Sequence, residues 1–257
     1  MSAPVLQIEQ VSMRFGGVLA LDDVSLNITP GHVHGFIGPN GAGKTTFFNV
    51  ITGLYQAEQG RFLLDGVAYR PTQVHKVAQA GIARTFQNIR LFKGMTVLEN
   101  VMVGRHVRTH NGLWAALTRH RRARDEERET RDTAQELLDY VGIGQWADSP
   151  ADSLSYGHQR RLEIARALAT EPRLLALDEP AAGMNATEKL QLRSLLERIR
   201  DDGHTVLLIE HDVKLVMGIC DRISVLDYGR VIAEGAPDVV RRHPAVIQAY
   251  LGGGAHV

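Results

Sequence analysis

Cysteine is almost absent from this sequence, and neither sign of charge is in excess. Cys220 is the only cysteine among 257 residues, so no disulfide can form within the chain, which is typical of a reducing compartment. Lys plus Arg number 29 and Asp plus Glu number 29. No overall basic field therefore argues for nucleic acid as a partner or for an anionic membrane surface.

Long hydrophobic runs are also missing. No stretch approaches the ~18 consecutive apolar residues that mark a membrane-spanning helix. Residues 1–10 lack the basic segment and long apolar run of a secretory signal. We therefore expect a cytoplasmic protein, and any role at a membrane has to come through a partner.

The sequence does contain short apolar strands that alternate with helical segments. Strands or hairpins are expected at residues 5–15, 18–28, 32–38, 61–69, 173–180, 204–211 and 222–235, and helices at residues 45–54 and 189–203. Strands alternating with helices predict an α/β fold whose parallel sheet is covered on both faces. From Met95 to about Gly144 the apolar spacing is helical, which indicates an inserted helical segment. The charged run Arg119 to Asp132 within it is expected to be a solvated helix face.

A phosphate-binding loop stands between a predicted strand and a predicted helix. The stretch GPNGAGKTT fits the pattern G-x-x-x-x-G-K-[ST]. Such a loop turns successive amides toward a β-phosphate, while its Lys reaches the β- and γ-phosphates and its hydroxyl is placed for Mg²⁺. The nucleotide-binding residues predicted here are Gly38, Pro39, Asn40, Gly41, Ala42, Gly43, Lys44, Thr45 and Thr46.

Polar side chains follow two other buried strands. Asp178 and Glu179 come where the strand RLLALDEP emerges, and His211 ends the strand of LLIEHD. An aspartate at that position can hold Mg²⁺, and the carboxylate after it can orient or deprotonate an attacking water. The carboxyl ends of parallel strands form the ligand-binding edge of such a sheet, so we expect His211 at the same edge.

The stretch LSYGHQRRLEIARALA, residues 154–169, starts with a polar turn and continues as an amphipathic helix. A helix that opens on Ser and Gly presents unpaired amides and a positive dipole end, which suits an anion. The residues themselves do not say whether that anion is bound to this chain or to another.

In their order along the chain, GPNGAGKT, LSYGHQ, LLALDEP and the His of IEHD resemble the ATP-binding cassette transporter ATPases. LSYGHQ is similar to that family's signature motif, Gln87 in RTFQNIRLF to its glutamine loop, and Phe15 to its adenine-stacking aromatic residue. The likeness covers nearly the whole chain. It implies one ATPase domain over residues 1–257. Residues 1–94 and 170–257 would form a P-loop NTPase core with a mixed or parallel sheet and an N-terminal antiparallel β-subdomain, and residues 95–169 a helical subdomain.

The resemblance implies an ATPase that works in head-to-tail pairs, as a homodimer or with a second, different ATPase subunit. One subunit's signature helix then contacts ATP bound by the other, which assigns that contact to Ser155, Tyr156, Gly157 and His158. Catalytic roles fall to Glu179 as general base, His211 at the γ-phosphate and Gln87 as sensor. The implied cofactors are ATP and Mg²⁺, with Thr45, Gln87 and Asp178 as metal ligands.

Three positions depart from the family pattern. Tyr156 replaces the first signature Gly, and we expect its side chain to point away from phosphate. His158 replaces a Gln, and Asn185 stands where many members have Asp. Since Lys44 and Glu179 are retained, an active ATPase remains the expectation.

Several stretches together resemble the ATPase subunit of branched-chain and other hydrophobic amino acid importers: RTFQNIRLFKGMTVLENV, the SYG signature, DEPAAGMN and PAVIQAYLG. The implied partners are separate transmembrane permeases and, indirectly, a periplasmic substrate-binding protein, with the chain peripheral on the cytoplasmic face of the membrane. The main competing hypothesis is the ATPase of an export system such as that for lipopolysaccharide. Two more hypotheses are a non-transport cassette protein that acts on ribosomes or DNA and a nucleotide-sensing scaffold without turnover.

Overall fold

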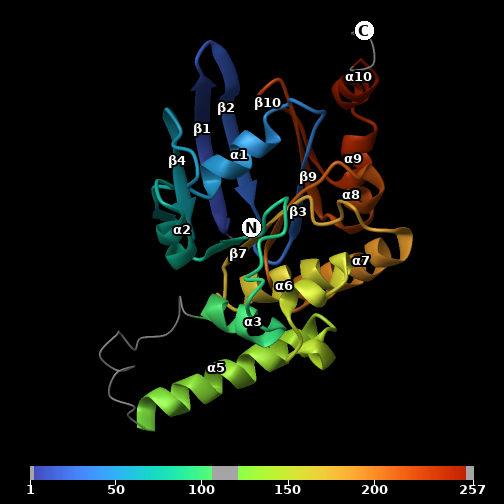
Figure 1. The fold of residues 1–257 in the computed structure, drawn as a ribbon. Helices are drawn as coiled ribbons and strands as arrows, with labels where there is room; N and C mark the ends of the chain where they lie inside the picture. The colour runs from blue at the N-terminus through green and yellow to red at the C-terminus, as the bar shows by residue number, and fades with distance from the viewer. Residues whose placement is uncertain (1–2, 106–120, 253–257) are drawn as a thin grey trace. The chain divides into compact units, whose positions relative to one another are not determined.

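The computed structural model describes residues 3–105 and 121–252. The chain divides into two compact units. The first, here called the core unit, consists of Met1–Arg84 and Arg173–Val257, and the second, the inserted unit, of Thr85–Pro172. The labels of Figure 1 are used below for the elements of each unit.

A four-stranded antiparallel sheet forms one part of the core unit. Its order is β2-β1-β4-β5, with β1 at Leu6–Phe15, β2 at Val18–Ile28, β4 at Gln59–Leu64 and β5 at Val67–Ala68. Apolar side chains of β1 at every second position, such as Leu6 and Ile8, are buried while their neighbours are less covered. This period of two is the reason that the segment forms a strand with one face on the core.

A six-stranded mixed sheet forms the other part of the core unit. Its order is β10-β9-β3-β8-β7-β6. The strands are β3 at Val33–Ile37, β6 at Ile82–Arg84, β7 at Leu174–Asp178, β8 at Val206–Ile209, β9 at Arg222–Asp227 and β10 at Arg230–Gly235. All neighbours pair in parallel except β9 and β10, which are antiparallel. The central strands β3, β7 and β8 are buried throughout, as strands covered on both faces are.

The helices of the core unit are α1 at Lys44–Ile51, α2 at Val74–Ala80, α7 at Ala186–Asp201, α8 at Val213–Ile219, α9 at Pro237–Arg241 and α10 at Pro244–Gly252. The start of α7 is set by a capping box in which Asn185 and Glu188 each accept from the other's backbone N–H. Phe47 of α1 stacks on Phe36 of β3 with ring centroids 4.2 Å apart, which fixes α1 against the sheet.

The inserted unit is helical. It contains α3 at Val97–Arg105, α5 at Arg121–Tyr140 and α6 at Tyr156–Leu168, with 3₁₀ turns at Gly144–Trp146 and Ala151–Ser153. Gly104 lets α3 approach α6, because a Cβ there would lie 2.3 Å from the carbonyl oxygen of Arg166. Residues 125–132 of α5 are mostly exposed, which confirms for that range the predicted solvated face.

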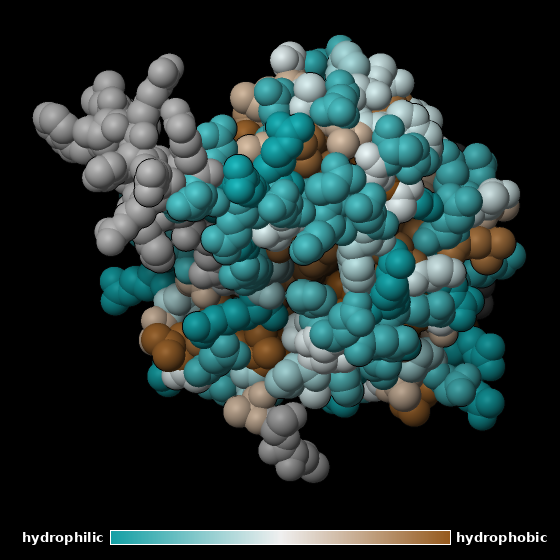
Figure 2. All heavy atoms as spheres, turned by 90° about the horizontal axis from the view of Figure 1, so that it is seen from below, coloured by the Kyte–Doolittle hydropathy of each residue, from teal (hydrophilic) through white to brown (hydrophobic). Residues whose placement is uncertain are grey.

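The predicted α/β class, with an antiparallel sheet, a mixed sheet and a helical segment, is confirmed. The pattern gave no expectation for α2, β6, α8, α9 or α10. Within the described ranges, no helix combines the length and hydropathy that crossing a membrane requires. The face drawn in Figure 2 is largely hydrophilic, with small separated hydrophobic areas.

Candidate functional site

The loop from Gly38 to Thr46 leaves β3 and enters α1, where the sequence predicted it. Two of its glycines are required by close approach to other backbone. A Cβ on Gly38 would lie 2.1 Å from the carbonyl oxygen of Leu226, and one on Gly43 would lie 2.5 Å from that of Ala20. Gly43 also has a φ of 108°, a conformation that side chains rarely adopt. The loop therefore keeps its curled shape only with glycine at these positions.

Lys44, the first residue of α1, is buried and its ammonium group lies inside the loop. Its Nζ donates to the carbonyl oxygens of Gly38 at 2.7 Å and of Pro39 at 2.9 Å. Burial lowers the pKa of Lys44, and the negative charge of Glu179 acts in the opposite direction. A positive charge held in this way beside the amides at the start of a helix is suited to polyphosphate oxygens.

Oxygen donors for a hard cation are also present in the core unit. Thr45 is exposed in the first turn of α1, and Asp178 is buried at the end of β7. No group of three or more His, Cys, Asp or Glu side chains that would cage a metal occurs among the described residues. Mg²⁺ is usually bound by one or two protein oxygens together with phosphate oxygens and water, so a hydroxyl and a carboxylate fit it.

Glu179 and His211 are brought together by the register of two strands. Asp178 of β7 pairs with Ile209 of β8, and the Glu179 N–H donates to the Ile209 carbonyl at 2.8 Å. The Nδ1 atom of His211 then lies 3.6 Å from Oε2 of Glu179. Glu179 has a φ of 45°, a strained backbone conformation of the kind that occurs at functional sites.

Five other site residues of the prediction lie in the inserted unit: Gln87, Ser155, Tyr156, Gly157 and His158. Ser155 is the N-cap of α6, and its Oγ accepts from the His158 N–H at 3.4 Å. Gly157 is buried in the first turn, while Gln87 is exposed. The ring of His158 lies against that of Trp146, with centroids 4.2 Å apart and the ring planes tilted by 39°.

Tyr156 points back along α6 rather than forward from its N-terminus. Its hydroxyl accepts from NH2 of Arg160 at 3.1 Å. Arg160 is fully buried, and it also donates to the carbonyl oxygens of Phe86 at 2.6 Å and of Gln87 at 2.8 Å. The bulky residue at this position of the signature therefore takes part in a contact that holds the backbone of Gln87.

Comparisons with known proteins show which family the chain matches. A family model described as ABC transporter matches residues 21–182, and one described as branched-chain amino acid ATP-binding cassette transporter matches residues 230–256. The chain is 47% identical over 253 residues to the high-affinity branched-chain amino acid transport ATP-binding protein BraF of Pseudomonas aeruginosa, covering 98% of this chain and 99% of that protein.

Among solved structures, the ADP conformation of MJ1267, an ATP-binding cassette of an ABC transporter, has a TM-score of 0.84 and 31% identity, and the match covers 98% of this chain and 100% of that one. A dimeric structure of a post-hydrolysis state of the ATP-binding cassette MJ0796, bound to ADP and Pi, has a TM-score of 0.75 and 26% identity, with 90% and 98% covered. The chain belongs to the ABC transporter family. The predicted family and its ATPase activity are thereby confirmed.

Tyr55 is an aromatic residue beside Phe15 that the sequence prediction of the site did not include. Phe15 is 45% exposed at the end of β1, and the ring of Tyr55 meets it edge to face with centroids 5.4 Å apart. Two partly exposed aromatic rings in this contact offer a stacking surface for a base. The sequence signal was only an aromatic residue after α1, which on its own is not specific.

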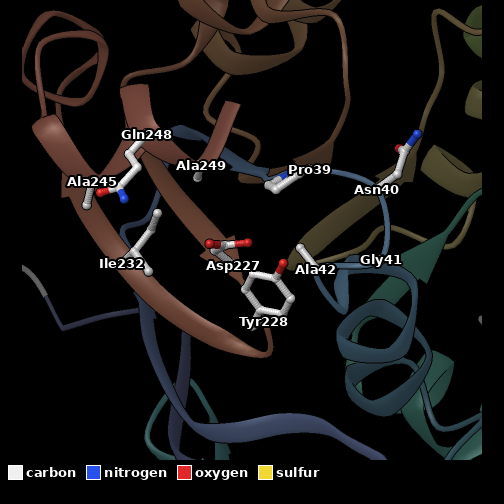
Figure 3. Close-up of a pocket in the computed structure, with 10 residues that line it drawn as sticks. All are labelled: Pro39, Asn40, Gly41, Ala42, Asp227, Tyr228, Ile232, Ala245, Gln248 and Ala249. Carbon is white, nitrogen blue, oxygen red and sulfur yellow. The ribbon is translucent and has the colours of Figure 1, made fainter. Parts of the chain in front are cut away.

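A cavity of about 590 Å³ lies beside the phosphate loop of this ABC transporter chain (Figure 3). It is lined by Pro39, Asn40, Gly41, Ala42, Asp227, Tyr228, Ile232, Ala245, Gln248 and Ala249. The Asp227 carboxylate faces into it and the side chain of Asn40 points away from the other labelled side chains. Lys44 does not line it, and a carboxylate opposes a triphosphate, so we do not place the nucleotide in this cavity.

Proposed function

We propose that this chain is the ATP-hydrolysing subunit of an importer that takes up branched-chain or other hydrophobic amino acids through separate permease subunits. The observation that carries this proposal is the 47% identity to BraF over nearly the full length of both proteins. The match of residues 230–256 to a model of branched-chain amino acid cassettes supports the same substrate class. That segment includes α9 and α10, outside the motifs common to cassette ATPases.

ATP binding falls to the loop and to Phe15. The loop amides and Lys44 bind the phosphates, and the ring of Phe15 stacks on adenine beside Tyr55. Thr45, Asp178 and Gln87 would hold Mg²⁺, which neutralises charge on the phosphate oxygens when bound. Gly38 and Gly43 let the loop backbone lie close to the carbonyl oxygens of Leu226 and Ala20, which keeps the loop in the shape that these contacts need.

Hydrolysis assigns distinct roles to Glu179 and His211. The Glu179 carboxylate takes a proton from the attacking water as the water oxygen bonds to the γ-phosphorus and the bond to the ADP oxygen breaks. We assign the contact with the γ-phosphate to the His211 imidazole, and its Nδ1 lies 3.6 Å from Oε2 of Glu179, which supports this role. Together they hold the attacking water in line with the γ-phosphate. Such positioning accounts for much of the rate enhancement of a phosphoryl transfer.

Ser155, Tyr156, Gly157 and His158 would serve a nucleotide bound by a second ATPase subunit. The N-terminus of α6 supplies backbone amides, and the Tyr156 side chain is turned to Arg160, which supports binding through the backbone. Because one anion then links two subunits, hydrolysis and release weaken the dimer. The second subunit is either identical to this chain or a different ATPase.

The other partners are transmembrane permeases and, indirectly, a periplasmic substrate-binding protein, and the chain lies on the cytoplasmic face of the membrane. Gln87 is the residue assigned to link the nucleotide to the permease contact. Nucleic acid is not proposed as a partner, in line with the equal numbers of acidic and basic residues.

The test is an uptake assay with radiolabelled leucine, isoleucine and valine in cells that lack this chain. We expect the wild-type chain to restore uptake and the Lys44→Ala and Glu179→Gln chains to fail at equal expression. Purification of the wild-type complex should recover permease subunits and support ATP hydrolysis. Normal uptake without the chain, together with a defect in lipopolysaccharide export, would favour the export hypothesis and overturn import.

A further inference from the structure

A buried carboxylate next to His211 has no part in the roles assigned so far. Glu210 follows β8 directly and its exposed fraction is 0%. Its Oε1 accepts from the Ala181 N–H at 2.8 Å. Its Oε2 accepts from the N–H groups of His211 at 3.1 Å and Asp212 at 3.4 Å. A buried ionised group is costly unless it is well paired, and here backbone donors from two segments pair it.

The two segments joined by Glu210 carry the two catalytic side chains. Ala181 lies two residues after Glu179, in the turn that begins there, and its position is fixed by the first carboxylate oxygen. His211 and Asp212 follow β8, and the second oxygen fixes them. The Glu210 side chain therefore reaches a residue 29 positions away and holds the turn after β7 to the turn after β8.

Glu210 and Glu179 both lie near the imidazole ring of His211. The Nδ1 atom of His211 lies 3.8 Å from Oε2 of Glu210 and 3.6 Å from Oε2 of Glu179. The ring thus lies between two carboxylates, one fully buried and the other 20% exposed. Rotation of the 210–212 turn would change the distance from His211 to Glu179, because Glu179 belongs to the other turn.

An ion pair also connects the turn after β8 with α7, the helix that follows the turn after β7. Lys189 of α7 pairs with Asp212 at 2.7 Å, and Asp212 is the N-cap of α8. This pair is partly exposed, and such pairs contribute little to stability. Replacing Lys189 removes this ion pair and leaves the buried Glu210 carboxylate in place, so it serves as a control.

We propose that Glu210 is a positioning residue that holds the turn after Glu179 and the His211 turn as one unit, so that base and histidine act on the same phosphate. The inference rests on the proposed function and adds a residue to it. A neutral side chain of the same size would fill the space, but only a carboxylate offers acceptors to both turns at once. Glu210 itself contacts neither the nucleotide nor the water in this arrangement.

The first test is Glu210→Gln in the purified transporter complex, with Lys189→Met as the matched control. The amide keeps one acceptor oxygen, and its NH2 group faces N–H donors of the other turn. We expect kcat for ATP hydrolysis to fall about 10- to 100-fold, because small misplacements of reacting groups have effects of this order. The KM for ATP should stay within about twofold of wild type in both variants, and Lys189→Met should keep its kcat.

The second test combines Glu210→Gln with Glu179→Gln. A residue that acts by holding the base and the histidine relative to each other has little left to affect once the base is removed, so the double variant should hydrolyse ATP no more slowly than Glu179→Gln alone. A multiplicative loss in the double variant, or wild-type kcat in Glu210→Gln, overturns the inference while the proposed ATPase stands. Absence of hydrolysis by the wild-type complex contradicts the proposed function instead.

If Glu210→Gln fails to fold, Glu210→Asp tests the same positioning role. Its carboxylate is one methylene shorter, so it reaches the donors of only one turn while keeping the charge. Urea unfolding midpoints are measured for every variant, so that lost activity is assigned only to folded protein. A folded Asp variant with wild-type kcat would overturn the positioning role.

Discussion

Replacement of Arg160 by Met should destabilise the inserted unit by several kcal/mol. The guanidinium group is fully buried, and its NH1 lies 2.8 Å from Oε2 of Glu163, which is 1% exposed. Oε1 of the same carboxylate accepts from the Phe86 N–H at 3.1 Å. Removing one partner of a buried ion pair leaves an uncompensated charge and typically costs about 3–5 kcal/mol. We expect a loss in that range.

The double variant Arg160→Met/Glu163→Met separates the ion pair from its backbone contacts. Replacing both members of a buried pair with apolar residues is often nearly neutral. Here, however, the carbonyls of Phe86 and Gln87 lose a charged donor, and such bonds are worth about 1.5–3 kcal/mol each. The double variant should therefore remain at least about 3 kcal/mol less stable than wild type.

Urea unfolding provides the measurement. The chain has 2 tryptophans, Trp114 and Trp146, so a Trp114→Phe background leaves Trp146 as the only tryptophan, whose fluorescence then reports on the inserted unit. Coincident transitions by fluorescence and by circular dichroism justify a single free energy of unfolding. A double variant within about 1 kcal/mol of wild type would refute the reasoning, because it would show that the contacts to Phe86 and Gln87 add no stability.

Four further outcomes are expected. Glu179→Gln should bind ATP normally but lower kcat by orders of magnitude, and unchanged turnover would remove the base assignment. Lys44→Ala should abolish nucleotide binding by calorimetry, and wild-type affinity would count against the phosphate loop. Phe15→Ala should weaken ATP binding roughly tenfold, since a base–aromatic contact is worth ~1–3 kcal/mol; unaltered binding would contradict stacking. Burial, with smaller effects of Arg222 and His32, lowers the pKa of His34 to about 3 from 6.5. Between pH 6.5 and about 3, the unfolded state binds a proton at His34 and the folded state does not. The free energy of unfolding therefore decreases as the pH falls through this range, by up to ~1.4 kcal/mol per pH unit. In urea titrations from pH 6.5 to 4.5, His34→Gln should flatten this slope, and equal slopes would exclude His34 as the cause.

The predicted catalytic residues at the strand ends of the core unit could be found in the sequence because the patterns that mark them are local. The glycine spacing before Lys44 and the carboxylates after a buried strand are short patterns whose meaning does not depend on distant residues. Strand and helix periods placed these patterns at the edge of a parallel sheet, where β7 and β8 bring Glu179 and His211 together. Very short elements could not be predicted, because a segment of three residues such as Ile82–Arg84 is too short to show a hydrophobic periodicity.

Tertiary structure alone decided which groups support these residues. Arg160 meets the Phe86 carbonyl across 74 positions, and Glu210 meets Ala181 across 29. A lone Arg on an amphipathic helix or a Glu after a strand is most simply a solvated charge by sequence. Each becomes a buried anchor because the fold brings backbone groups from another segment to it. The sequence by itself thus determined which chemistry the chain performs, since local spacing sets the reacting groups. The partners that hold those groups are set by long-range packing, which no local pattern encodes.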